Sequence, residues 1–375
     1  MLATFIMGIL LYVYGIIMLY YRYGWVRSHN LFQPNDYRSS TRFSIIIAAR
    51  NEEKNIDACL DAIHQLNYPK ALYEIIVIDD HSEDKTADIV ASYNDVTLLY
   101  LSDHIKDGNR AYKKQALSLG ISKSSGDYIV TTDADCIVPK NWLRCFDLII
   151  QQKSTAFIAA PVMIQKEKNI LQIFESLDFM MLQGITAAAV STGLHTMSNG
   201  ANLCYRKSAF EKVGGFAEVD GIASGDDMLL MQKIKQSFPN EIHYCKSREA
   251  IVTTVGAENL SSFIRQRIRW ASKGKYYKEH KLKLILLSVF LLNFFLLLLM
   301  IGHLLYAELF FLLCISLCIK MIAELIFLIP VSLFYNKEKI LPFFILLQPV
   351  HIFYMVIAAF LGYFTKYHWK GRVVR

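Results

Sequence analysis

Long stretches without a single Asp, Glu, Lys or Arg constrain the fold of this 375-residue chain most. Each is long enough to cross roughly 30 Å of hydrocarbon as a helix. A further apolar stretch is interrupted only by Lys320 and Glu324, which stand four residues apart and can therefore pair on one helix face. We expect a membrane-embedded protein. The uncharged stretches are residues 1–21, 284–307 and 340–365, and the interrupted one is 309–335.

The first stretch, Met1–Tyr21, has no basic residue before its apolar run and is too long for a cleaved signal peptide, so we predict a transmembrane anchor. Basic residues follow this anchor and precede residue 284, and the positive-inside rule then places residues 42–281 in the cytoplasm. Residues 284–365 are predicted to form a C-terminal transmembrane region of about three hydrophobic segments. We expect a multi-pass protein of the cell inner (cytoplasmic) membrane.

Three full crossings in the C-terminal region would leave the basic C-terminus outside, against the positive-inside rule. One segment is therefore expected to be interfacial, re-entrant or an exception to the rule. Pro342 and Pro349 make residues 340–365 the segment in which we expect this irregularity, because proline interrupts helical hydrogen bonding.

The formal net charge of +7 is modest, and the basic clusters lie beside the apolar stretches. That placement is expected for contacts with anionic headgroups, so we predict membrane lipids and no nucleic acid among the partners. The seven cysteines are scattered and show neither a disulfide framework nor the spacing of a zinc site.

From residue 43 to about residue 128, short apolar segments alternate with helical ones, which is typical of a parallel sheet in an α/β fold. We predict strands at residues 43–49, 74–78, 96–101 and 127–132. Helices are predicted at residues 53–66, 84–93, 113–121 and 141–151.

Two carboxylates, Asp133 and Asp135, follow the fourth predicted strand. Ligands bind beyond the carboxyl ends of strands in open α/β sheets. Neighbouring desolvated carboxylates repel each other unless a cation lies between them, and Mg²⁺ is typically bound by one or two carboxylates together with substrate phosphates. A sugar nucleotide supplies such phosphates. The alternative is a pair of solvated loop acids, which is the commoner case for an isolated Asp-x-Asp.

The other strand ends also carry polar residues. Glu52 follows the first strand, and Asp79 and Asp80 follow the second, where a carboxylate can accept from a base N–H or a ribose hydroxyl. Ser82 and Asp84 are interpreted instead as residues of an Asx-turn and a helix N-cap.

Lys113 begins the third predicted helix and can reach a diphosphate as a point charge, although a lone lysine is more often a solvated surface residue. The turn at Asn199 and Gly200 is a candidate entry point for an acceptor, and an ordinary turn is nearly as common.

Taken in order, these motifs resemble the family 2 inverting glycosyltransferases of the GT-A fold. The resemblance is greatest to the membrane-bound branch that includes cellulose, chitin, hyaluronan and poly-N-acetylglucosamine synthases, and it covers residues 43–270. It predicts an α/β, Rossmann-like nucleotide-sugar-binding domain flanked by transmembrane helices. The motifs are Asp79-Asp80, Asp133-Ala134-Asp135, Gly225-Asp226-Asp227 and Gln266-Arg267-Ile268-Arg269-Trp270.

The resemblance also implies roles for individual residues. Asp79 and Asp80 would contact the nucleoside, with Glu52 and Lys113 also in the nucleotide-sugar site. Asp133 and Asp135 would bind nucleotide and Mg²⁺ or Mn²⁺, Asp227 would be the catalytic base, and Gln266, Arg269 and Trp270 would close the site. The chain departs from the family at His81 and Tyr112, where glycine is usual, and at Asp226, where glutamate is usual.

Inverting transfer is one in-line displacement, which needs a base for the acceptor hydroxyl and neutralisation of the leaving phosphates. Asp227 can be that base, and the alternative is a first-turn acid favoured by the helix dipole. Gln266, Arg269 and Trp270 fall on one helical face, where the guanidinium can bind a diphosphate and the indole can face a sugar or the acceptor. The alternative for this segment is an interfacial helix at the headgroups.

We therefore predict a membrane-anchored inverting glycosyltransferase that transfers a hexose or N-acetylhexosamine from a UDP-sugar. The predicted acceptor is a lipid-linked saccharide or a polysaccharide at the cytoplasmic membrane face. One alternative is a processive polysaccharide synthase that also secretes its polymer. Another is a catalytically inactive membrane scaffold or lipid-transport subunit.

Overall fold

The computed structural model describes residues 1–28, 30–31, 37–104, 111–219, 222, 225–364, 367–369 and 372–374. It divides into two compact units, each assembled from separated parts of the chain. The helical unit comprises Met1–Arg27, Glu167–His195 and Gly256–Tyr367. The sheet unit comprises Ser28–Lys166, Thr196–Val255 and His368–Arg375.

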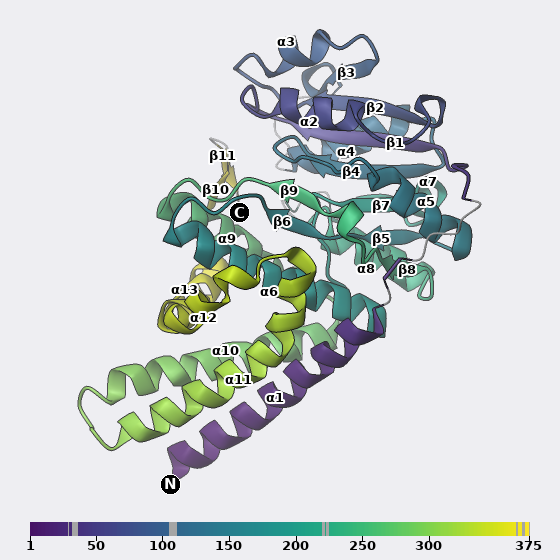
Figure 1. Ribbon diagram of the computed structural model, residues 1–375. Coiled ribbons are helices and arrows are strands. Elements are labelled where there is room, and N and C mark those ends of the chain that lie inside the picture. The colour runs from purple at the N-terminus through teal and green to yellow at the C-terminus, as the bar shows by residue number, and fades with distance from the viewer. Residues whose placement is uncertain are drawn as a thin grey trace. The chain divides into compact units, whose positions relative to one another are not determined.

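A seven-stranded sheet with the order β3-β2-β1-β4-β7-β5-β8 forms the centre of the sheet unit (Figure 1). The first four strands along the chain are parallel. β2 and β3 are added on one side of β1, and β4 is then added on its other side. α/β sheets bind ligands at such a switch point in strand order. Ile45, Ile46 and Ile47 of β1 are fully buried, as expected for a strand covered on both faces. These strands are β1 (Phe43–Ala49), β2 (Tyr73–Asp79), β3 (Val96–Tyr100) and β4 (Tyr128–Asp133).

The remaining strands widen this sheet and add two small ones. β7 (Leu203–Arg206) runs antiparallel between β4 and β5 (Phe157–Ala159), and β8 (Ile242–Tyr244) is parallel to β5. The small sheets pair β6 (Val162–Ile164) with β9 (Val252–Thr254), and β10 (Tyr367–Trp369) with β11 (Arg372–Val374).

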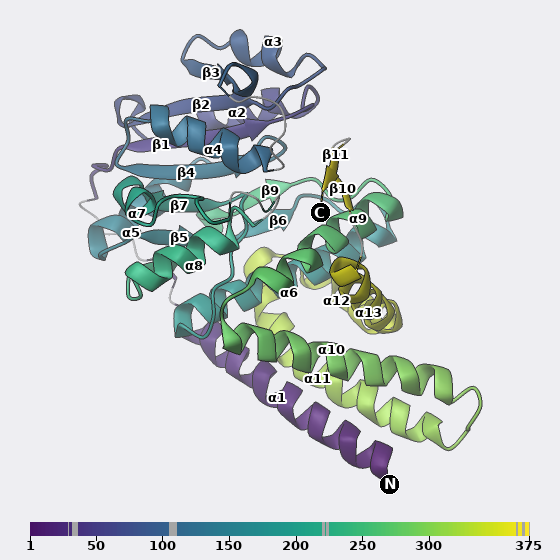
Figure 2. The same cartoon turned by 180° about the vertical axis from the view of Figure 1, so that it is seen from behind.

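Helices cover both faces of the large sheet, with α2 and α4 on opposite faces (Figures 1 and 2). Gly120 lets α4 approach closely, because a Cβ there would lie 2.6 Å from Ile78 Cδ1. The helices of this unit are α2 (Ile56–His64), α3 (Thr86–Ala91), α4 (Tyr112–Lys123), α5 (Trp142–Gln152), α7 (Lys207–Lys212) and α8 (Met228–Ser237), with 3₁₀ turns η1 (Lys70–Leu72), η2 (Leu101–Asp103) and η3 (Arg248–Ala250).

The predicted α/β fold class is confirmed, and the first predicted strand has the observed bounds. The first predicted helix begins too early, since α2 starts at Ile56 rather than at residue 53. The intervening residues form a turn in which Asn51 has a φ of 51° and the Glu53 N–H donates to Asp84 Oδ2. The Glu53 N–H is therefore paired in this turn, whereas the first N–H groups of a helix have no partner within the helix.

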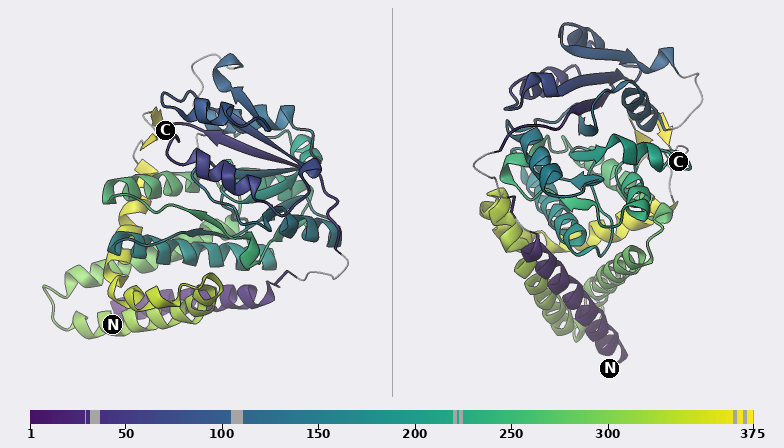
Figure 3. Two further views of the ribbon diagram at one scale, coloured as in Figure 1. Left: turned by 45° about the horizontal axis from the view of Figure 1, so that its top comes forward. Right: turned by 90° about the vertical axis from the view of Figure 1, so that its right-hand side faces the viewer.

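The helical unit contains the long apolar helices, of which α1, α10 and α11 lie side by side (Figures 1 and 3). Its helices are α1 (Leu2–Arg27), α6 (Ile170–Thr192), α9 (Leu260–Ala271), α10 (His280–Gly302), α11 (Leu309–Tyr335), α12 (Leu341–Leu346) and α13 (Gln348–Phe364), with 3₁₀ turns η4 (Ser272–Tyr276) and η5 (Glu338–Ile340).

Among the described residues, four helices are long and apolar enough to cross a membrane: α1, α6, α10 and α11. The sequence interpretation missed α6, because Glu175 and Asp178 interrupt its apolar pattern. This helix packs closely with its neighbours: a Cβ on Gly184 would lie 2.7 Å from Val331 Cγ2 of α11. α6 therefore belongs to the helical unit, although its residues fall inside the predicted cytoplasmic range 42–281.

The helical conformation is interrupted at Leu347, inside the segment where we expected an irregularity. The helical parts on either side of this break, 338–346 and 348–364, are bent by 76°. Pro342 and Pro349 stand at the starts of α12 and α13, where a missing N–H costs no helical hydrogen bond. Residue 365, the predicted end of this region, lies outside the described residues.

A buried polar cluster links this broken segment to α11. Lys320 Nζ donates to both carboxylate oxygens of Glu324, at 2.7 and 2.9 Å, and to Gln348 Oε1 at 2.8 Å. Gln348 is the first residue of α13, and its side-chain amide donates to Glu324 Oε2 at 2.9 Å. Tyr14 of α1 donates to the other carboxylate oxygen. The predicted pairing of Lys320 with Glu324 is confirmed.

Candidate active site

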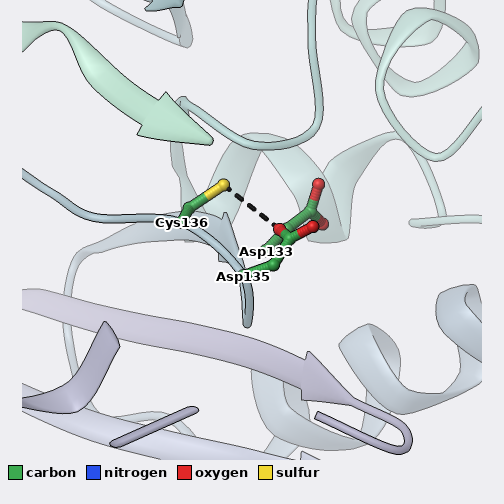
Figure 4. A group of neighbouring side chains, drawn as sticks. All are labelled: Asp133, Asp135 and Cys136. Atoms are coloured by element: carbon green, nitrogen blue, oxygen red, sulfur yellow. Dashed lines mark hydrogen bonds between the residues drawn. The ribbon is translucent and has the colours of Figure 1, made fainter. Parts of the chain in front are cut away.

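Three potential ligand groups meet at the carboxyl end of β4. Asp133 is the last residue of that strand, and ligand atoms of Asp133, Asp135 and Cys136 all lie within 4.8 Å of one another (Figure 4). Both carboxylates are half-buried. Two carboxylates at this spacing suit a hard divalent cation that also binds phosphate oxygens. The residues present therefore fit the predicted Mg²⁺ or Mn²⁺.

Cys136 was not among the predicted site residues. Its thiol donates to Asp135 Oδ1 at 3.5 Å (Figure 4). Burial, followed by the charges of Asp135 and Asp133, raises the pKa of this thiol well above its usual value. A protonated thiol is a poor ligand for a hard cation but a donor to a carboxylate, so Cys136 orients Asp135.

Lys113 connects the end of β4 to a second pair of acids. Its Nζ donates to Asp133 Oδ1 at 2.7 Å and lies 3.2 Å from Asp226 Oδ2. Burial alone would lower the pKa of Lys113, but the charges of Asp133, Asp226 and Asp227 outweigh burial and raise it. The side chain is therefore a cation located between the two carboxylates.

Asp227 lies immediately before α8 and caps it. Its Oδ1 accepts the Met228 N–H at 2.7 Å, and the residue is only 8% exposed. The preceding Gly225 has a φ of 86°, a conformation that favours glycine. The helix-start role given above as the alternative is thus present. It does not exclude a base, because a carboxylate has two oxygens.

The turn at Asn199 and Gly200 contacts this acid cluster. A Cβ on Gly200 would lie 3.2 Å from Asp226 Oδ2 and 3.4 Å from Lys113 Nζ, so a larger residue would displace the cluster. The Asn199 side-chain oxygen accepts the Ala201 N–H at 3.0 Å, which forms the turn itself. Gly200 therefore borders the site, while the described contact of the Asn199 side chain is structural.

The acids after β2 have separate environments. Asp79 is 6% exposed, and its Oδ2 accepts the Ser82 N–H at 3.1 Å. Its Oδ1 is buried and has no hydrogen-bond partner among the described residues. Buried acceptors are usually paired, so this oxygen suits a donor supplied by a ligand. Asp80 is also buried, and its Oδ1 lies 3.0 Å from His81 Nδ1.

The turn after Asp80 explains the departure from the family at His81. His81 has a φ of 55°, which is why glycine is favourable there, and its ring contacts Tyr112 edge-on at 5.7 Å. The predicted Asx-turn is present at Asp84, whose Oδ1 accepts the Thr86 N–H at 3.0 Å. The predicted N-cap is wrong, because Lys85 stands at the N-cap of α3, and Ser82 Oγ and Asp84 Oδ2 instead accept the N–H groups of Asn51 and Glu53.

Glu52 lies in the turn that follows β1. Its side chain accepts from Asn55 Nδ2 at 2.8 Å, and its backbone N–H donates to Thr86 Oγ1. These contacts connect the turn after β1 to the start of α3. A direct contact of Glu52 with a nucleotide stays a prediction.

Gln266, Arg269 and Trp270 lie half-buried on α9 in the helical unit, whereas the acids lie in the sheet unit. Their closing of the site stays a prediction. The residue overlooked in this motif is Arg267, which is 2% exposed and pairs with Asp178 Oδ2 of α6 at 3.0 Å. It stands at a position between Gln266 and Arg269 that the Gln-x-x-Arg-Trp pattern leaves unspecified, so the motif did not single it out.

Comparisons with known proteins agree with this architecture. Residues 44–214 match the model of glycosyl transferase family 2. A probable glycosyltransferase of Bacillus subtilis is 27% identical over 274 residues, which is 70% of this chain and 64% of the relative. A poly-beta-1,6-N-acetyl-D-glucosamine synthase of Staphylococcus epidermidis is 26% identical over 254 residues, 66% of this chain and 58% of the relative. The matches thus span less than two thirds of these relatives' length.

A mannosyltransferase from Pyrobaculum calidifontis, solved in complex with GDP-Man and Mn²⁺, has a similar fold. It superposes with a TM-score of 0.55 over 96% of this chain and 97% of the mannosyltransferase, at 16% identity. This likeness supports the fold and not the substrate. The family match, together with the strand-end acids, shows that residues 44–214 form a glycosyl transferase family 2 domain, and the likeness to the mannosyltransferase supports its GT-A fold.

Proposed function

We propose that the protein is a membrane-anchored inverting glycosyltransferase. It transfers a hexose or N-acetylhexosamine from a UDP-sugar to a lipid-linked or polysaccharide acceptor at the cytoplasmic membrane face. The observation that supports this most is the acid cluster joined by Lys113: Asp133 at the end of β4 and Asp226 beside Asp227 share one ammonium. A membrane scaffold or lipid-transport subunit has no need for such an arrangement.

The donor side of the reaction uses the strand ends. Asp133 and Asp135 would bind Mg²⁺ or Mn²⁺, which supplies charge neutralisation for a leaving diphosphate. Asp79, with its unpaired buried oxygen, would accept a hydrogen bond from the nucleoside, and Asp80 lies next to it. Lys113 adds a positive charge near the phosphates and can exchange a carboxylate oxygen for a phosphate oxygen.

The acceptor side uses Asp227. Its carboxylate takes the proton of the acceptor hydroxyl while that oxygen forms a bond to the anomeric carbon. The bond from this carbon to the diphosphate oxygen breaks in the same step, which inverts the anomeric configuration. The hydrogen bond from the Met228 N–H fixes the side-chain rotamer of Asp227, so the second oxygen keeps one direction.

Incubation of the purified full-length protein with a panel of UDP-sugars tests this proposal. We expect one UDP-hexose or UDP-N-acetylhexosamine to release UDP in the presence of Mn²⁺ or Mg²⁺, with EDTA abolishing release. GDP-Man belongs in the panel because the structural relative was solved with it. Folded protein that neither binds nor cleaves any of these donors would support the scaffold instead.

A second candidate function is a processive synthase. It is favoured by the likeness to a protein named as a poly-beta-1,6-N-acetyl-D-glucosamine synthase and by the Gln-x-x-Arg-Trp motif. The four candidate membrane helices among the described residues are few for a polymer channel and favour single or limited addition. Product length decides: a ladder of long products from UDP-N-acetylglucosamine indicates processivity, and a single added sugar indicates the first candidate.

A further inference from the structure

Two successive lysines at the start of α4 contact the chain that leads to Asp226 and Asp227. Lys113 pairs with the Asp226 side chain, as described above. Lys114 Nζ donates to the backbone carbonyl oxygens of Val219 at 2.7 Å and Ile222 at 2.8 Å. Ile222 precedes Asp226 by only four residues in the sequence, so the two lysines contact residues on both sides of a short interval.

The burial of Lys114 shows that this is not a surface contact. The residue is 1% exposed, which makes it one of the largest fully buried side chains of the protein. Removing an ammonium from water is costly unless its donors are well paired. An apolar side chain of similar volume, such as methionine, would fill the same space without that cost. The lysine therefore contributes directed hydrogen bonds to two fixed points of the backbone.

We infer that Lys114 is a positioning residue for Asp227, an inference that rests on the proposed role of Asp227 as base. Lys114 binds the Val219 and Ile222 carbonyls, and Lys113 pairs with the side chain of Asp226. Because the two lysines are adjacent on one helix, the base is positioned relative to Asp133, the proposed donor-binding carboxylate. A displacement of about 1 Å in such a group costs about 10²-fold in rate.

Lys233 of α8 offers a matched control. Its Nζ also donates to two backbone carbonyls, those of Gly215 at 2.7 Å and Ala217 at 2.9 Å. Lys233→Met thus removes hydrogen bonds of the same type, but at points farther from Asp226 along the chain. Both substitutions replace a lysine with an apolar side chain of similar length.

The test is a double-mutant cycle on the full-length protein. Lys114→Met should lower kcat for sugar transfer about 10²-fold and leave the Kd for UDP-sugar within about threefold, since only the base is misplaced. Lys233→Met should keep kcat within about threefold, as expected for a residue outside the site. In an Asp227→Asn background, Lys114→Met should cause no further loss, because the group it positions is already disabled.

Several outcomes separate this inference from the proposed function. Near-wild-type transfer by Asp227→Asn would remove the base and with it the basis of the inference. If kcat collapses in Asp227→Asn while Lys114→Met and Lys233→Met have equal and small effects, the inference is overturned and the proposed function stands. Additive losses of kcat in the double-mutant cycle would have the same meaning. If Lys114→Met does not fold, the same cycle with Lys114→Gln decides, because the shorter, uncharged amide weakens the bonds to both carbonyls but leaves them a polar neighbour. A loss of kcat that disappears in the Asp227→Asn background supports the inference, and wild-type kcat overturns it.

Discussion

The guanidinium carbon of Arg267 lies 4.2 Å from the centre of the Trp270 ring. The same guanidinium pairs with Asp178 of α6, so one face of the indole is covered from within the helical unit. A sugar ring that stacks on Trp270 must therefore use the other face or the edge. The two arginines of the motif differ: Arg267 is buried in an ion pair, and Arg269 is half-buried.

Because of that difference, alanine should reduce mainly stability at Arg267 and mainly sugar transfer at Arg269. Arg267→Ala leaves Asp178 buried without its cation and should cost about 3–5 kcal/mol of unfolding free energy. Arg269→Ala should cost about 1 kcal/mol or less and mainly reduce sugar transfer. Denaturant titration of both variants in the same detergent, with transfer assays alongside, measures the difference. Equal stability of the two variants would contradict the buried pairing.

Metal dependence should be lost on removal of Asp135. Asp135→Ala removes one of the two carboxylate ligands of the cation. Without the cation, the donor diphosphate would face the negative charge of Asp133, so metal-dependent UDP-sugar binding should disappear. Titration calorimetry with and without Mn²⁺ measures this. Asp103→Ala, at an exposed acid of η2, is the control and should bind as the wild type does. Wild-type affinity in Asp135→Ala would show that the strand-end acids are ordinary loop residues.

Asp227→Asn should separate chemistry from binding. The amide oxygen can still accept the Met228 N–H, so stability should change by less than about 1 kcal/mol. General-base help is worth about 10²–10⁴-fold, and kcat should fall by that factor while UDP-sugar affinity stays near normal. Binding and transfer measured on one preparation show whether both statements hold. If transfer persists, Asp226 is the next acid to replace.

The buried pair of α11 predicts a rescue. Lys320→Met leaves the Glu324 carboxylate uncompensated and should destabilise the protein by about 3–5 kcal/mol. Adding Glu324→Leu should recover most of that loss, because an apolar pair of similar volume is often neutral or stabilising. Unfolding titrations of the two single variants and the double variant test this. Losses that simply add would show that Lys320 and Glu324 act independently.

Local patterns predicted the parts of the fold that depend on neighbours in sequence. Alternating strands and helices gave the parallel sheet, and the acids after β2 and β4 followed from their place at strand ends. Contacts between distant segments were not accessible in this way. Nothing near Lys113 in sequence distinguishes it from a surface lysine, yet it pairs with Asp226, 113 residues later.

The same limit explains why the length and apolar character of α6 and several residues were overlooked. Glu175 and Asp178 interrupt the apolar pattern of α6, and their partner Arg267 comes from α9, which the local pattern does not reveal. The sequence did not indicate a role for Cys136, because that role depends on the position of its thiol relative to Asp135. Burial of Lys114 depends on Val219 and Ile222, which follow it by about a hundred residues. Hydrophobic periodicity reports on neighbouring residues and cannot predict ion pairs between distant segments.

The polar cluster at Lys320 also has a consequence for how the helices assemble. Lys320 and Glu324 stand one turn apart, so their charges neutralise each other as soon as α11 forms. A lone lysine at the centre of a membrane helix costs about 2.5–3.5 kcal/mol to insert, and the internal pair reduces that cost. Gln348 and Tyr14 add hydrogen bonds to this pair from α13 and α1. α11 therefore carries the counterion for its own lysine, and the broken segment and α1 pack against a pair that is already neutral within one helix.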